Sequence, residues 1–141
     1  MRNYAPSISS DGRLIAWVSD ESGSNQVYVQ ALSGGARIPA SVNGGLEPLW
    51  SPTGTTLFYR SPSGIVAADI GGSPLRVTRR DSLFADSFVR VGLRAVGRNW
   101  DVFPNGKEFL MVRPLGSEAT GAFVVLNWPQ LKVSPSGAAR P

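Results

Sequence analysis

The sequence predicts an all-β fold built from repeated units, and three observations support that prediction. The chain of 141 residues contains 16 Gly and 11 Pro, which fall at short intervals, as expected where many short strands need turns. The apolar runs between them are rich in β-branched and aromatic residues and lack a helical period. Residues 6–12, 48–54 and 100–106 also align without gaps, and the Gly that ends each segment lies 42 and then 52 residues after the previous one.

Each aligned segment ends in a turn that precedes an apolar run. The turns are Asp11-Gly12, Thr53-Gly54 and Asn105-Gly106. We expect Gly54 and Gly106 to adopt positive φ in hairpins that join the first two strands of a unit. A period near 40–45 residues is typical of the four-stranded antiparallel blades of a β-propeller, and the longer spacing indicates an insertion. The sequence therefore predicts a partial β-propeller of about three blades.

The blades can be placed along the chain. Blade one is expected at residues 1–44, blade two at 45–98 with an insertion at 79–98, and an incomplete blade three at 99–128, followed by a disordered tail at 129–141. Outer strands are expected around 36–40 in blade one and 75–78 in blade two, after the Gly34-Gly35 and Gly71-Gly72 turns. No helix is expected.

The repeated motif is similar to that of a known family. Pro48-Leu49-Trp50-Ser51-Pro52-Thr53-Gly54, and Ser9-Ser10-Asp11-Gly12 followed by Leu14-Ile15-Ala16-Trp17-Val18-Ser19-Asp20, resemble the WD40-like (PD40) repeat of TolB-like propellers. The resemblance covers residues 4 to about 128, although Ser10 replaces the preferred Pro and Thr53 the preferred Asp. It implies a propeller that is usually six-bladed.

A narrower resemblance concerns residues 18–23, 47–52 and 124–128, which look like the C-terminal propeller end of bacterial serine/threonine kinase-linked proteins. It implies a sensing or docking propeller, which would be extracytoplasmic. The kinase motifs themselves are absent from the sequence, so kinase activity does not follow. The sequence contains no signal peptide and no membrane segment, and the compartment stays open.

The composition excludes several kinds of chemistry. The chain has no Cys and no His, so it cannot form a disulfide, a Cys/His zinc site or a Ser-His-Asp triad. No nucleotide-binding glycine loop is present. Asp11, Asp20 and Glu21 could suggest a calcium loop, but they flank a strand, so a turn role is favoured for the two Asp. We therefore expect no catalytic, cofactor or metal site and no enzymatic turnover by this chain.

The net charge of +4 is concentrated in the second half of the chain. Six Arg occur within 23 residues, with Phe84 and Phe88 among them: Arg76, Arg79, Arg80, Arg90, Arg94 and Arg98. Arg90, Arg94 and Arg98, spaced by four residues on the insertion, are candidate partner-binding residues. An Arg-rich groove with aromatic side chains could bind nucleic acid, whereas a solvated loop explains the same pattern and is the favoured interpretation.

The predicted function is a non-catalytic propeller module for protein–protein interaction or ligand sensing, as a portion of a larger protein. Its partner, a protein or a small ligand, is expected at the propeller mouth, since fold alone does not name it. An alternative is the substrate-gating propeller portion of a prolyl-oligopeptidase-like hydrolase. A weaker alternative is Arg-driven nucleic-acid binding, with nucleic acid an unlikely partner.

Three blades form an open arc, which leaves apolar faces uncovered at its two ends. Of the four Trp, Trp17, Trp50, Trp100 and Trp128, we expect most to pack between blades. The uncovered residues are expected to include Trp17, Val27 and Val29 at one end and Met111, Val124 and Leu126 at the other. Missing blades from a longer chain, or a second copy assembled head to tail, could cover these faces.

Overall fold

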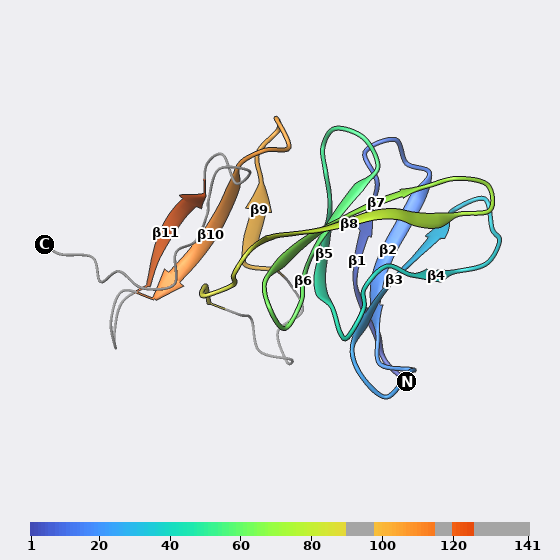
Figure 1. Cartoon of the computed structure of the whole chain (residues 1–141), viewed down its shortest axis with the longest axis horizontal. Helices are drawn as coiled ribbons and strands as arrows, with labels where there is room; N and C mark the ends of the chain where they lie inside the picture. The colour runs from blue at the N-terminus through green and yellow to red at the C-terminus, as the bar shows by residue number, and fades with distance from the viewer. Residues whose placement is uncertain (90–97, 115–119, 126–141) are drawn as a thin grey trace, which may run out of the picture.

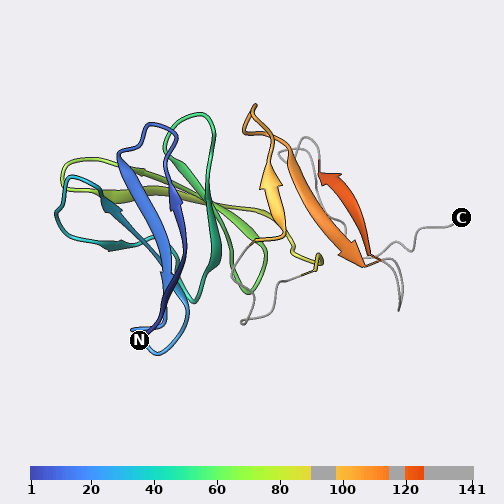
Figure 2. The ribbon, with the colours of Figure 1, turned by 180° about the vertical axis from the view of Figure 1, so that it is seen from behind.

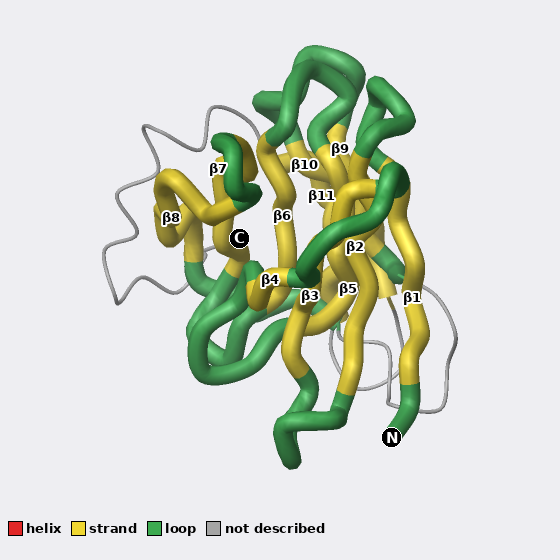
Figure 3. Tube along the Cα trace, turned by 90° about the vertical axis from the view of Figure 1, so that its right-hand side faces the viewer, coloured by secondary structure: helices red, strands yellow, loops and turns green. Residues whose placement is uncertain are grey.

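The computed structural model describes residues 1–89, 98–114 and 120–125, which form three antiparallel sheets placed side by side (Figures 1 and 2). These residues form no helix, and hence none that could span a membrane (Figure 3). The first sheet, blade one, has the order β1-β2-β3-β4: β1 (Asn3–Ile8), β2 (Leu14–Ser19), β3 (Gln26–Ala31) and β4 (Ile38–Pro39).

The other two sheets repeat this arrangement. Blade two has the order β5-β6-β7-β8: β5 (Leu46–Trp50), β6 (Thr56–Arg60), β7 (Ile65–Gly71) and β8 (Arg76–Phe84). Blade three has three described strands in the order β9-β10-β11: β9 (Trp100–Val102), β10 (Phe109–Pro114) and β11 (Thr120–Val125). Within each blade, every strand pairs antiparallel with the strand that follows it along the chain, as in propeller blades.

The first hairpin of every blade closes with the same backbone hydrogen bond. The N–H groups of Ser9, Ser51 and Phe103 each donate to the carbonyl five residues later, at 2.8–2.9 Å. Gly54 and Gly106 have φ of 93° and 68°, which confirms their predicted positive φ. The three turns lie at the same end of the molecule, at the top of Figure 1. The three segments that align in the sequence therefore form equivalent hairpins in the structure.

A second shared feature is a bulge in the innermost strand. The pairing register shifts between Tyr4 and Ser7 in β1, and between Leu46 and Leu49 in β5. Ala5 and Glu47 occupy the same repeat position within these bulges, with φ of 53° and 50°. Because a bulge reorients the side chains around it, Glu47 is turned into the protein interior, where it is 7% exposed.

Two apolar cores hold the blades together. We call the face that a blade turns toward the next blade its forward face, and the opposite one its back face. The forward face of blade one packs on the back face of blade two, with residues that include Ala16, Val18, Val27, Val29, Trp50, Leu57, Tyr59 and Ile70. The forward face of blade two packs on the back face of blade three, with residues that include Phe58, Ile65, Phe84, Trp100, Phe109 and Met111.

The two cores show which of the residues expected at the ends of the arc are buried between blades instead. Trp17 lies half-buried on the back face of blade one, as predicted. The prediction was wrong for Val27, Val29 and Met111, which are fully buried between blades. The error has a simple cause: successive strand residues point to opposite faces, and Val27 and Val29 point away from the face of Trp17. Leu126 lies outside the described residues, and the side chain of Val124 is not described.

The outer strand of blade two is longer than predicted. It was expected near residues 75–78, but β8 continues to Phe84, so that residues 79–84 of the predicted insertion are strand. Its partner β7 has seven residues, which pair with seven of the nine residues of β8, and the two register shifts accommodate the other two, Thr78 and Leu83. Arg79, Arg80 and Asp81 lie in this stretch and obscured the alternation that would have indicated a strand.

Gly64 is required by a close approach between β7 and the end of β8. A Cβ built there would lie 2.2 Å from the carbonyl oxygen of Phe84, so the backbone would have to move. We expect Gly64→Ala to lower the free energy of unfolding by about 1–3 kcal/mol, measured by chemical denaturation. Gly71→Ala, where the new Cβ would meet nothing within 4 Å, is the control. Equal effects of the two substitutions would contradict this packing.

Candidate functional site

A groove of about 590 Å³ lies between blades one and two. It is formed by turns of both blades, with residues 11–14 and 31–33 on one side and Thr55, residues 70–72 and Leu75 on the other. The floor is apolar, because Leu14 and Ile70 are buried there, while Leu32 is 52% exposed at the side. Its volume and its mostly apolar lining are typical of binding sites for small molecules or side chains. We refer to it as the inter-blade groove.

Asp11 and Arg13 form the polar side of the groove. Asp11 accepts hydrogen bonds from the hydroxyl of Ser9 at 2.7 Å, and from the backbone N–H and Nε of Arg13 at 3.0 and 2.7 Å. These bonds lower the pKa of Asp11 to about 2, with the Ser9 hydroxyl the largest cause. Asp11 is therefore ionised at neutral pH and occupied within its own turn. Its stabilising effect is present above the unfolded pKa and is lost as the pH falls toward 2.

The charge of the groove is positive at its edges. Asp11 is neutralised by Arg13, whose side chain is 79% exposed. On the opposite side, the guanidinium group of Arg76 lies against Gly72, where a Cβ would approach its Nη1 to 2.7 Å. Two exposed guanidinium groups thus flank an apolar floor. Such a groove suits a ligand that combines an apolar group with a carboxylate.

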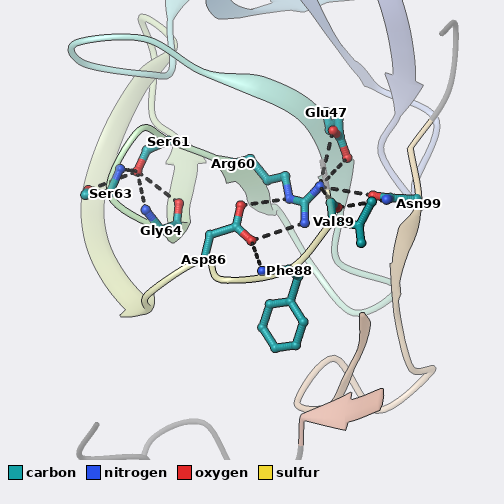
Figure 4. A network of polar contacts seen from close by, with 9 residues as sticks. All are labelled: Glu47, Arg60, Ser61, Ser63, Gly64, Asp86, Phe88, Val89 and Asn99. Carbon is teal, nitrogen blue, oxygen red and sulfur yellow. Dashed lines mark hydrogen bonds and ion pairs between the residues drawn. The ribbon is translucent and has the colours of Figure 1, made fainter. Parts of the chain in front are cut away.

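A second polar cluster lies buried around Arg60, at the end of β6 (Figure 4). Its guanidinium group forms an ion pair with Asp86 through Nε at 3.0 Å and donates to Asp86 through Nη2 at 3.1 Å. Nη1 lies 3.4 Å from each carboxylate oxygen of Glu47 and donates to Val89 O at 2.9 Å and Asn99 Oδ1 at 3.0 Å. We call these five residues the Arg60 cluster.

The Arg60 cluster fixes the predicted insertion of residues 79–98 to blade two. Asp86 and Val89 lie within that insertion and Asn99 directly follows it, and Asn99 also donates to the carbonyl of Val89 at 2.8 Å. The side chains of Arg60 and Asp86 are fully buried, which indicates a structural role for the cluster. No motif in the sequence predicts it. The available signal was an Arg at the repeat position that holds Val18 in blade one and Val112 in blade three.

The candidate partner-binding arginines are only partly described. Arg98 is exposed just before β9, whereas Arg90 and Arg94 lie outside the described residues. Among the other arginines of that run, Arg79 pairs with Asp81 at 2.7 Å, and Arg80 donates to the carbonyl of Ala40 in blade one at 2.9 Å.

The aromatic residues of the same region belong to the core. Phe84 is buried and makes edge contacts with Phe88 and Phe109, at centroid distances of 6.3 and 5.5 Å. Phe84 therefore does not form the base-stacking surface that a nucleic-acid groove needs. Trp50 and Trp100 pack between blades as predicted, and Trp128 lies outside the described residues.

The Asp residues considered for calcium serve turns. Asp11 closes the first hairpin as described, and Asp20 accepts the N–H of Gly23 with its backbone carbonyl and binds Arg2 with its carboxylate. In the part of the chain that the structure describes, no three acidic side chains come together as metal ligands would.

Comparisons with known proteins identify the fold. No protein-family model and no curated protein sequence matches this chain. The structure is similar to that of TolB from Acinetobacter baumannii, with a TM-score of 0.62 and 20% identity, over 88% of this chain and 30% of that one. It is also similar to a TolB candidate from Agrobacterium tumefaciens, with a TM-score of 0.61 and 10% identity, over 91% of this chain and 47% of that one. The chain spans less than half the length of these structures, and it has the fold of a TolB-like β-propeller.

Proposed function

We propose that the chain is a non-catalytic interaction module that binds a segment of a partner protein in the inter-blade groove. The observation that carries this proposal is the groove itself, an apolar hollow of about 590 Å³ flanked by the exposed Arg13 and Arg76. The favoured ligand is a peptide segment that places an apolar side chain on Leu14 and Ile70 and a carboxylate near the arginines.

The groove is preformed, which lowers the cost of binding. Its two sides are joined by the first apolar core and by two bonds between blades, Trp50 Nε1 to Ser7 O at 3.0 Å and Arg80 Nε to Ala40 O at 2.9 Å. A peptide segment that binds in the groove therefore loses its own conformational freedom, but the groove residues do not have to be ordered as well. The acidic side chain of the lining, Asp11, is occupied by Ser9 and Arg13, so binding rather than proton transfer is the chemistry that the groove supports.

The test is selection of binding peptides from a displayed random library on the immobilised chain, followed by affinity measurements on variants. We expect the selected peptides to contain acidic and apolar residues. Leu32→Asp should abolish binding because it places a charge at the apolar side of the groove, and Arg76→Glu should weaken binding about tenfold by repelling the carboxylate. Val42→Asp is the matched control, since Val42 is 55% exposed, close to the 52% of Leu32, but lies outside the groove.

Two results would contradict the proposal. One is a selection that enriches no peptide for the wild-type chain. The other is a selected peptide whose affinity is unchanged by Leu32→Asp, because that peptide would bind elsewhere.

A further inference from the structure

Blade one carries a back face that has the same construction as the buried back faces of blades two and three. Trp17 occupies the repeat position of Tyr59 and Met111, which are 2% and 0% exposed, but Trp17 is only half-buried. Ile8 occupies the position of Trp50, which is 4% exposed, yet Ile8 is 59% exposed. The back face of blade one is therefore apolar at the positions that a neighbouring blade covers elsewhere in this chain.

The back face of blade one also has a shallow hollow and a charged side chain. It contains a shallow hollow of about 380 Å³ lined in part by Ile15, Trp17 and Arg37. The ring of Trp17 stacks on Tyr28 at a centroid distance of 6.1 Å, and the guanidinium group of Arg37 lies 5.4 Å from the Tyr28 ring centroid. Arg37 keeps 48% of its side chain exposed while it pairs with Glu21 at 2.8 Å.

The opposite end of the stack is a forward face, that of blade three. Leu110 occupies the repeat position of Ala16 and Phe58, which are 0% and 3% exposed on the covered forward faces, but Leu110 is 38% exposed. Asp101 pairs with Leu110 in register and therefore shares its face, where it is exposed. The uncovered forward face thus carries an acidic residue, and the uncovered back face carries Arg37.

We propose that the forward face of blade three in a second copy of this chain covers the back face of blade one. The contact would pair a forward face with a back face, as both interfaces inside the chain do, and it would bring Asp101 of one copy to the face that holds Arg37 of the other. Such a head-to-tail contact closes when the blades complete a ring. Propellers close with four to eight blades, so two copies with three blades each form a closed ring and a third copy would exceed the range.

The first experiment is the molar mass of the full chain by sedimentation equilibrium over a range of concentrations. We expect a dimer that dissociates reversibly on dilution. A folded monomer at the highest soluble concentration would overturn the proposal, and so would aggregation without a defined mass.

Two single variants then test which faces meet. Trp17→Asp and Leu110→Asp should each weaken dimerisation by roughly 30-fold or more, because buried aromatic and apolar anchors dominate such interfaces. Both positions are partly exposed in one chain, so both variants should keep the wild-type far-UV circular dichroism and, at concentrations at which the wild type is monomeric, its unfolding curve. Val42→Asp, at an exposed apolar position away from both faces, should dimerise like the wild type. A dimer that Leu110→Asp leaves intact would overturn the head-to-tail arrangement.

Mixing provides the decisive comparison. Trp17→Asp retains an intact forward face and Leu110→Asp an intact back face, so the heterodimer of the two has one wild-type contact, whereas each homodimer carries a substitution in both contacts. An equimolar mixture should therefore dimerise more strongly than either variant alone. Charge reversal adds a second rescue: Arg37→Glu and Asp101→Arg should each weaken dimerisation, and the double variant should restore it. Failure of both rescues would overturn the proposal even if the single variants lose the dimer.

Discussion

Replacing Arg60 with Met is expected to lower the free energy of unfolding by about 3–5 kcal/mol, which is among the largest effects of any single substitution in this chain. Met fills a similar volume but removes the ion pair that Arg60 forms with the fully buried carboxylate of Asp86. Glu47, whose side chain is 9% exposed, loses the same partner. Removing the cation that faces two buried carboxylates is costly because the low-dielectric interior cannot replace their hydration.

The control for Arg60→Met is Arg79→Met. Arg79 also forms an ion pair at 2.7 Å, with Asp81, but its side chain is 69% exposed. Exposed pairs contribute about 0–1 kcal/mol, so this variant should unfold close to the wild type in urea denaturation. Comparable losses for the two variants would contradict the buried cluster. Adding Asp86→Asn to Arg60→Met should recover part of the loss, because the second change removes one of the two buried carboxylates that face Arg60.

Phe109→Ala is expected to cost about 3–5 kcal/mol and to loosen blade three specifically. Phe109 is fully buried between blades two and three, where its ring contacts Phe58, Phe84 and Trp100 at centroid distances of 5.0, 5.5 and 6.1 Å. Truncation removes these contacts and leaves a cavity at the interface. Urea denaturation measures the loss, and amide hydrogen exchange should show the loss of protection in β9 and β10.

The neighbouring Leu110→Ala tests whether the interface is the cause. Leu110 lies on the same strand but points to the other face and is 38% exposed, so its truncation should cost far less. Exchange protection of β2 and β3, which lie at the far core, should be retained in Phe109→Ala. Equal losses for Phe109→Ala and Leu110→Ala would mean that the side chain of Phe109 does not pack between blades.

The repeated hairpins were predictable because they depend on local sequence. Asp11-Gly12, Thr53-Gly54 and Asn105-Gly106 specify turn conformations within a few residues, and the equal spacing to the apolar runs aligned the three blades. The same regularity placed Trp50 and Trp100 between blades.

Features that depend on contacts between residues far apart in the sequence could not be predicted from local patterns. Arg60 bonds to a residue 39 positions away, and a single Arg in a strand does not indicate its partners. The inter-blade groove arises from turns of two blades, and no motif marks Leu32 or Leu75 as its lining. The prediction placed Val27 and Val29 on the wrong face of blade one. The alternation of side chains along a strand indicates that the sheet has two faces, but it does not indicate which face packs on the next blade.

The blades stack forward face to back face, and the most direct test of this stacking is a proton NMR cross-peak from the indole N–H of Trp50. That group donates to the carbonyl of Ser7, so it joins blade two to blade one at 3.0 Å. The chain has four Trp, which single Trp→Phe variants assign. The stacked arrangement predicts strong cross-peaks from the Trp50 indole proton to protons of Ser7 and Ile8, together with slow exchange of that proton with water. An indole proton that exchanges rapidly and shows no contact with β1 would contradict the stack.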